Sequence, residues 1–101
     1  MAKRFICKLA EVKDGGLKEV TLEGEKKICV INASGVFFAC QAACPHEQFS
    51  LCDGILEGTT LTCIEHLWQW DLRSGEPMGL AEEPLPMFGV EVEGDSLYLK
   101  G

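Results

Sequence analysis

Two short segments of the chain each combine a cysteine with a histidine, and together they contain both histidines of the sequence. The first reads C-P-H over residues 44–46 and the second reads C-I-E-H over residues 63–66, with sixteen residues between them. Each segment therefore offers one thiolate and one imidazole. Such a donor set indicates a metal site shared by two loops.

The mixed pairs favour a cluster of two irons over a single metal ion. Zinc would accept the four side chains, but structural zinc sites usually begin with a cysteine pair or end with a histidine pair. In a [2Fe–2S] centre each segment can give its cysteine to one iron and its histidine to the other. The pattern predicts Cys44 and Cys63 on one iron and His46 and His66 on the other, which is the Rieske arrangement. Structural zinc stays the alternative.

The same residues argue against two kinds of enzyme. A cysteine nucleophile needs a cleft and a third group that orients its base, and no catalytic signature surrounds either cysteine. A non-haem iron oxygenase needs further histidines and a carboxylate for its reaction iron, and no histidine is left once His46 and His66 are used. We expect a chain that carries an electron but performs no substrate chemistry.

The length and the remaining cysteines predict one domain in a reducing compartment. The 101 residues suffice for a modest core. Disulfides would suit a secreted protein, but Lys8 and Glu11 interrupt any signal-like stretch near the N-terminus. No apolar run approaches the roughly 20 residues that span a bilayer. We therefore expect a cytoplasmic protein without a membrane segment. Its other cysteines are expected to pack as small apolar groups: Cys7, Cys29, Cys40 and Cys52.

The charge is negative and unevenly distributed. The formal net charge is −7, and Arg73 is the only basic residue between Ile28 and Leu99, a span with eleven acidic residues. Such a surface makes nucleic acid an unsuitable partner. Glu47 and Glu65 adjoin the predicted ligands, so they could form a docking face for basic patches on redox partners. Solubility is the alternative explanation for the acidic excess.

Short apolar segments separated by glycine-containing turns predict an all-β domain, an antiparallel sandwich or barrel of eight or nine strands. Both ligand segments follow a predicted strand, so a rigid scaffold would present the metal on loops. A stretch with three prolines, from Pro77 to Pro86, predicts a stiff and irregular connection. The expected strands are 4–9, 17–23, 26–32, 36–42, 55–57, 60–64, 68–72, 87–93 and 96–100.

Residues 40–75 resemble the cluster-binding half of a Rieske-type ferredoxin. The two ligand pairs carry the likeness, together with the D-G and E-G turns at 53–54 and 57–58 and the S-G turn at 74–75. A weaker similarity extends over the whole chain. The resemblance implies a single Rieske domain over residues 1–101, with a cluster-binding part at about 42–72.

In this family, such ferredoxins pass single electrons from a flavin-containing, NADH-dependent reductase to a terminal oxygenase. The run H-L-W-Q-W-D at 66–71 is similar to ferredoxins of soluble di-iron monooxygenases that attack aromatics and alkenes. The resemblance therefore implies an electron-transfer component of such a system, a monomer when free. A ferredoxin of a ring-hydroxylating dioxygenase and a redox-sensing module are the alternatives. The small subunit of nitrite reductase shares the fold and is a more distant possibility.

The residues around the second ligand pair indicate a low reduction potential. High-potential Rieske proteins have a loop disulfide, at positions where this chain has Gln48 and Glu65. They also place hydroxyl donors near the cluster, where this chain has Leu67, Trp68 and Trp70. Hydrogen bonds from hydroxyls stabilise the reduced cluster, so their absence lowers the potential. The two tryptophans, two residues apart, are expected to pack on a core. Leu67 and Trp68 are also candidates for an apolar docking contact.

The ligand assignment predicts the metal content. Purified protein should contain two irons and two sulfides per chain, with a rhombic EPR signal only after reduction. Cys44→Ser and Cys63→Ser should each lose the visible absorption, because a hydroxyl replaces a thiolate on iron poorly. Metal analysis that finds one zinc per chain in a colourless protein would exclude the iron cluster.

Overall fold

Eleven antiparallel strands and two 3₁₀ turns form the part of the chain that the computed structural model describes, residues 3–22, 27–42, 51–64, 67–79 and 81–100. The predicted all-β antiparallel fold is confirmed. The turns are η1 (Leu9–Glu11) and η3 (Leu51–Asp53). The strands are β1 (Arg4–Lys8), β2 (Leu17–Thr21), β3 (Lys27–Ala33), β4 (Val36–Gln41), β5 (Ile55–Glu57), β6 (Thr60–Thr62), β7 (Trp68–Asp71), β8 (Glu76–Gly79), β9 (Met87–Phe88), β10 (Val90–Glu93) and β11 (Ser96–Leu99).

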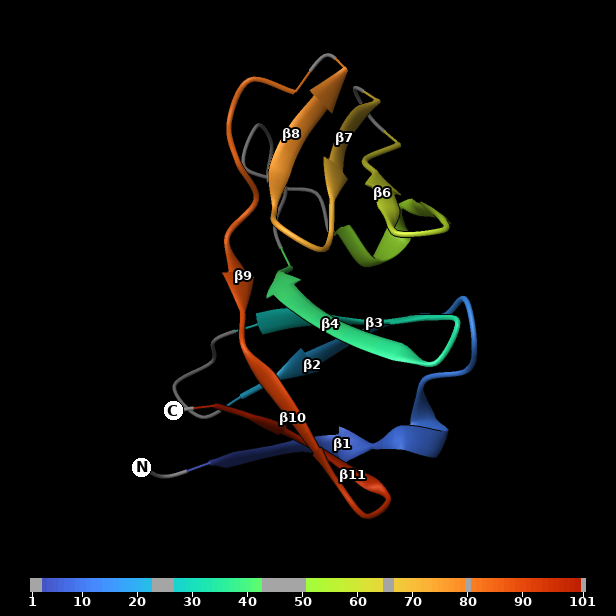
Figure 1. The fold of residues 1–101 in the computed structure, drawn as a ribbon, viewed down its shortest axis with the longest axis vertical. Coiled ribbons are helices and arrows are strands. Elements are labelled where there is room, and N and C mark those ends of the chain that lie inside the picture. The colour runs from blue at the N-terminus through green and yellow to red at the C-terminus, as the bar shows by residue number, and fades with distance from the viewer. Residues whose placement is uncertain (1–2, 23–26, 43–50, 65–66, 80, 101) are drawn as a thin grey trace.

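The strands form three sheets, which lie one above another in Figure 1. The sheet β1-β11-β10 lies at the bottom of that view and β5-β6-β7-β8 at the top, with β2-β3-β4-β9 between them. We call the lower two sheets the base and the upper sheet the cap. The first and last strands pair with each other in the base, so the cap is made entirely from the middle of the chain.

Strand β3 is buried on both faces, because a hydrophobic cluster lies on each side of it. Ile28 and Val30 belong to the cluster within the base, whereas Cys29 and Ile31 belong to the cluster beneath the cap. All four side chains are inaccessible to solvent. The period-two alternation of a strand thus divides one apolar run between two cores.

The stretch from Pro77 to Pro86 is predicted from the sequence to be an irregular connection. Its first residues instead belong to strand β8. In the cap, β8 pairs with β7 alone and is an edge strand, with Pro77 opposite Trp70. Proline is tolerated on an edge because its missing N–H is not needed for a second ladder. The predicted strand 87–93 is likewise two strands: β9 pairs with β4 and β10 with β11, so the chain changes sheets at Gly89.

The remainder of the proline-rich segment is attached to the cap and the base by backbone hydrogen bonds. The N–H of Leu85 donates to the carbonyl of Gly75 at 2.8 Å, and the N–H of Gln41 donates to the carbonyl of Pro86 at 3.2 Å. Gly75 has a φ of +81°, and a Cβ there would lie 2.5 Å from the Leu85 carbonyl oxygen. Only glycine fits both this conformation and this approach. Gly75 therefore holds the segment against the cap.

None of the helices in the described part of the chain is long and apolar enough to cross a membrane.

Replacement of Gly75 tests this contact, and Gly94 provides a matched control. Gly94 has a φ of +61° with open space around the added Cβ, so Gly94→Ala should cost only the left-handed conformation, roughly 1–2 kcal/mol. Gly75→Ala adds a steric conflict with backbone and should cost about 1–3 kcal/mol more. Urea denaturation of both variants measures the free energies of unfolding. Equal losses would mean that the Gly75–Leu85 contact is not required.

Candidate metal centre

The second predicted ligand pair lies at a hairpin loop between β6 and β7. Cys63 directly follows β6 and is 2% exposed. Its N–H donates to the carbonyl of Trp68 at 2.8 Å, and its carbonyl accepts a hydrogen bond from the N–H of Leu67 at 2.8 Å. Two backbone hydrogen bonds thus close the loop at Cys63 and fix the position of this residue where the loop begins.

Leu67 combines two unusual properties within this loop. Its φ is +59°, and its side chain is 58% exposed. The left-handed region is sparsely populated by residues other than glycine, because their Cβ approaches the following carbonyl. Ile64, on the other side of the loop, is also exposed at 50%. Strained, solvent-exposed apolar residues beside a predicted ligand are typical of a functional site.

The first predicted ligand pair lies outside the described residues, as do His66, Glu47 and Glu65. Within the part of the chain that is described, no group of three or more metal-binding side chains gathers. The residues that bound the first segment are described, however. The N–H of Leu51 donates to the carbonyl of Ala42 at 2.6 Å, so the two residues that bound the first segment lie side by side.

The ends of both ligand segments lie over one hydrophobic cluster. Leu51 at the end of the first segment and Cys63 at the start of the second belong to the same buried group, together with Leu61 of β6. The described residues that bound the two segments therefore contact the same hydrophobic cluster.

The two tryptophans of β7 are core residues, as their spacing predicts. Trp70 is inaccessible and Trp68 is 7% exposed, and their rings meet edge to face with centroids 6.1 Å apart. The indole N–H of Trp70 donates to the carbonyl of Glu83 at 2.9 Å. Trp68 thus exposes almost no surface, and of the two predicted apolar docking residues only Leu67 is exposed.

The predicted packing of the other cysteines is also confirmed. Cys7, Cys29 and Cys40 are buried, and Cys52 of η3 is half-buried against the cluster beneath the cap. Burial, and secondarily the nearby Glu11 carboxylate, raises the pKa of the Cys7 thiol. Because the thiolate is the reactive form of a cysteine, the raised pKa makes Cys7 a poor nucleophile.

The charge of the molecule is concentrated in the chain that forms the cap. Residues 43–86 contain eight acidic residues and one basic residue, Arg73, whereas the rest of the chain contains eight of each. Arg73 pairs with Asp71 at 3.0 Å and lowers the pKa of that carboxyl group. The other described acids of this region have no ion pair with any described residue: Asp53, Glu57, Glu76, Glu82 and Glu83.

The described acids of the base, in contrast, are paired with lysines, with the exception of Asp14. Lys3 contacts Glu91 and Glu93, Lys8 contacts Asp95, Lys18 contacts Glu11, and Lys27 contacts Glu19. These exposed pairs contribute little to stability, but they neutralise the base. The whole formal charge of −7 therefore belongs to the region that carries the predicted ligands.

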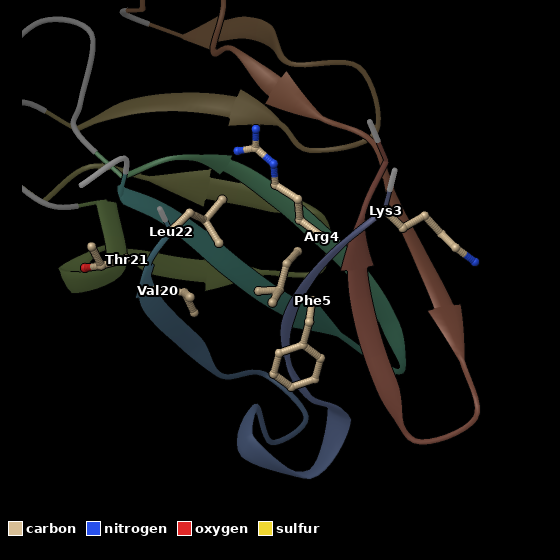
Figure 2. Close-up of a pocket in the computed structure, with 7 residues that line it drawn as sticks. Lys3, Arg4, Phe5, Val20, Thr21 and Leu22 are labelled. Carbon is tan, nitrogen blue, oxygen red and sulfur yellow. The ribbon is translucent and has the colours of Figure 1, made fainter. Parts of the chain in front are cut away.

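A groove of about 490 Å³ lies on the base, between β1 and β2. Figure 2 shows that its lining comes from these two strands and the residues beside them, including Arg4, Phe5 and Leu22. Neither strand belongs to the cap, so this groove is not part of the predicted metal centre.

The family to which the chain belongs follows from its similarity to known proteins. The Rieske [2Fe–2S] domain family matches residues 2–89. The chain belongs to this family. The predicted resemblance is thereby confirmed, and membership supports a Rieske-type cluster in a protein whose donor set, two thiolates and two imidazoles, suits one.

Two curated relatives of this Rieske protein are ferredoxins of oxygenase systems. The methanesulfonate monooxygenase ferredoxin subunit of Methylosulfonomonas methylovora is 33% identical over 96% of this chain and 79% of its own length. The biphenyl 2,3-dioxygenase ferredoxin component of Rhodococcus jostii strain RHA1 is 35% identical over 98% and 92%. A solved structure, the ferredoxin of Sphingomonas yanoikuyae B1, superposes with a TM-score of 0.91 at 27% identity and covers 99% of both chains.

Sequence reasoning missed two features of this Rieske protein. The left-handed conformation of Leu67 has no sequence signal, because glycine or asparagine is the usual occupant of such a position. The contact between Cys52 and Cys29 joins residues 23 positions apart. It depends on how η3 packs on β3, which the local sequence does not indicate.

Proposed function

We propose that this Rieske protein is a one-electron carrier of a multicomponent aromatic or alkene monooxygenase. It receives electrons from an NADH-dependent flavin reductase and delivers them to the terminal hydroxylase. It is not itself an enzyme, and it acts in the cytoplasm as a monomer. One observation carries the proposal: in a chain of this family, the buried Cys63 begins a loop in which the described exposed residues, Ile64 and Leu67, are apolar.

The four proposed ligands are Cys44 and Cys63 on one iron and His46 and His66 on the other. When bound, the [2Fe–2S] group accepts and releases a single electron. The chain contributes position and shielding: Cys63 is 2% exposed, so water is kept from its sulfur. His66 immediately precedes the exposed Leu67, and we place electron exchange with partners on this histidine side.

The proposal includes a low reduction potential. Leu67, Trp68 and Trp70 carry no hydroxyl, and the Trp70 N–H is already bonded to the carbonyl of Glu83. These side chains therefore supply no hydroxyl donor to stabilise the reduced group. We expect a potential toward the low end of the Rieske range, roughly −150 mV where the range extends to about +300 mV.

A ferredoxin of a ring-hydroxylating dioxygenase is the second candidate. Relatives of both kinds match at similar identity, 32% for an alkene monooxygenase ferredoxin and 35% for a biphenyl dioxygenase ferredoxin. The sequence H-L-W-Q-W-D at 66–71 favours the monooxygenase. A redox sensor is less well supported, because no DNA-binding module accompanies the ligand pairs in this sequence.

Reoxidation kinetics test the proposed function. The dithionite-reduced protein should be reoxidised rapidly by a di-iron aromatic or alkene hydroxylase and more slowly by the oxygenase of a ring-hydroxylating dioxygenase. Stopped-flow absorbance in the visible region follows both reactions. The opposite order of rates would assign the protein to the dioxygenase branch, and no reoxidation by either would favour a sensor.

Docking is expected to use the charge of the cap. The base carries equal numbers of acidic and basic residues, whereas residues 43–86 carry the net charge of −7. This separation orients the ligand-bearing end toward a basic partner, which raises the rate of productive encounter. Glu47 and Glu65 adjoin the proposed ligands and are the acids we place at the contact.

The double change Glu47→Gln and Glu65→Gln should lower the apparent affinity for the hydroxylase or reductase and leave the visible spectrum unchanged. The effect should be largest below about 0.1 M salt, where the screening length exceeds about 10 Å. Steady-state turnover measured against ferredoxin concentration provides the affinity. The matched control is Glu19→Gln with Glu93→Gln, which removes the same charge from paired acids of the base and should have little effect.

Neutral behaviour of both double variants, with turnover independent of salt, would make the acidic excess a solubility feature. Specificity would then rest on apolar contact at Leu67. Leu67→Asn retains a residue that tolerates positive φ and should weaken binding in that case. Val92→Thr changes an aliphatic residue of the base that is 49% exposed and is its control.

A further inference from the structure

Three cysteines lie in or against the hydrophobic cluster beneath the cap, and the proposed function uses none of them. Cys29 of β3 and Cys40 of β4 are directly opposite each other in the antiparallel pairing, and both are inaccessible to solvent. Cys52 approaches from η3, on the other side of the same hydrophobic cluster. Its Sγ lies 2.7 Å from the Sγ of Cys29.

The contact between Cys29 and Cys52 differs from ordinary packing of small apolar side chains. The S–S bond of a disulfide measures about 2.05 Å, so the two sulfurs need to approach by less than about 1 Å to become bonded. The residues are 23 positions apart in the chain, and tertiary packing alone brings them together. Cys29 is enclosed, whereas Cys52 is half-buried and retains contact with solvent.

We propose that Cys29 and Cys52 are a redox modification site, at which a hydroperoxide converts the two thiols to a reversible disulfide. In a reducing compartment such bonds are transient and depend on the oxidant present. Neither cysteine is one of the proposed iron ligands, and the proposal does not depend on which oxygenase the ferredoxin serves.

The first oxidation falls on Cys52. The pKa of the Cys29 thiol is raised, first by its hydrogen bond with Cys40 and further by burial, so Cys29 stays protonated and shielded. The Cys52 sulfur breaks the O–O bond of the hydroperoxide and becomes a sulfenic acid, with release of an alcohol, or of water from hydrogen peroxide. The Cys29 sulfur then attacks the Cys52 sulfur. Its proton leaves with the sulfenic hydroxyl as water, and the S–S bond forms.

The disulfide would close the chain between residues 29 and 52 into a loop that contains the first proposed ligand pair, Cys44 and His46. It would also tie η3, where that ligand segment re-enters the fold, to the central strand β3. A dithiol reductant would reopen the loop.

Peptide mapping of the cluster-loaded protein tests the site. The protein is treated with a small excess of hydrogen peroxide, its free thiols are alkylated under acid-quenched conditions, and it is cleaved after glutamate. Trypsin is unsuitable because residues 28–73 form a single tryptic peptide. Cleavage after glutamate separates peptide 26–47, with Cys29, Cys40 and Cys44, from peptide 48–57, in which Cys52 is the only cysteine.

The expected result is a cross-link between these two peptides that fragmentation assigns to Cys29, with the visible absorption of the cluster retained and the link reversed by dithiothreitol. Cys52→Ala should abolish the link, and Cys40→Ala, a matched change beside Cys29, should retain it. A Cys52 peptide that is not cross-linked and carries only added oxygen would overturn the proposal. A link from Cys52 to Cys40 or Cys44, or one that forms only after the absorption is lost, would also overturn it.

Discussion

The burial of strand β3 on both faces is the constraint on which the rest of the structure depends. Ile28 and Val30 pack into the base and Cys29 and Ile31 pack beneath the cap, so one strand joins two hydrophobic clusters. Neither cluster is large, and a domain of this size buries limited apolar surface. The two clusters share strand β3 and its hydrogen-bond ladder, so the base supports the cap. The four short strands of the cap would not be stable alone.

Backbone hydrogen bonds join the residues that bound each of the two segments with predicted ligands. Leu51 bonds to Ala42 across the first segment, and Cys63 bonds to Leu67 and Trp68 across the second. Fixed ends reduce the conformations available to a loop, so its side chains can be held for metal binding at a smaller entropic cost. The strained φ of Leu67 is tolerated within this frame. The predicted ligands thus lie between strands, and the strands provide the rigid support.

Charge follows the same division. The described acids of the base other than Asp14 pair with lysines, whereas the described acids of the cap region other than Asp71 have no ion pair with any described residue. Unpaired carboxylates at one end of a small protein produce a field that is felt over about one screening length. Such an arrangement affects the rate and orientation of encounter more than it affects the stability of the fold.

The sequence alone determined the all-β class, most strand positions and the burial of Trp68 and Trp70, and it alone predicts the two ligand pairs. These features follow from period-two hydrophobicity, turn residues and donor chemistry, which are local properties of the chain. The strand β8, the change of sheet at Gly89, the left-handed Leu67 and the contact of Cys52 with Cys29 were decided by tertiary structure. Each depends on which segments pack together across long stretches of sequence: Pro77 can enter a strand only because β8 lies at an edge, and two thiols meet only because η3 closes over β3.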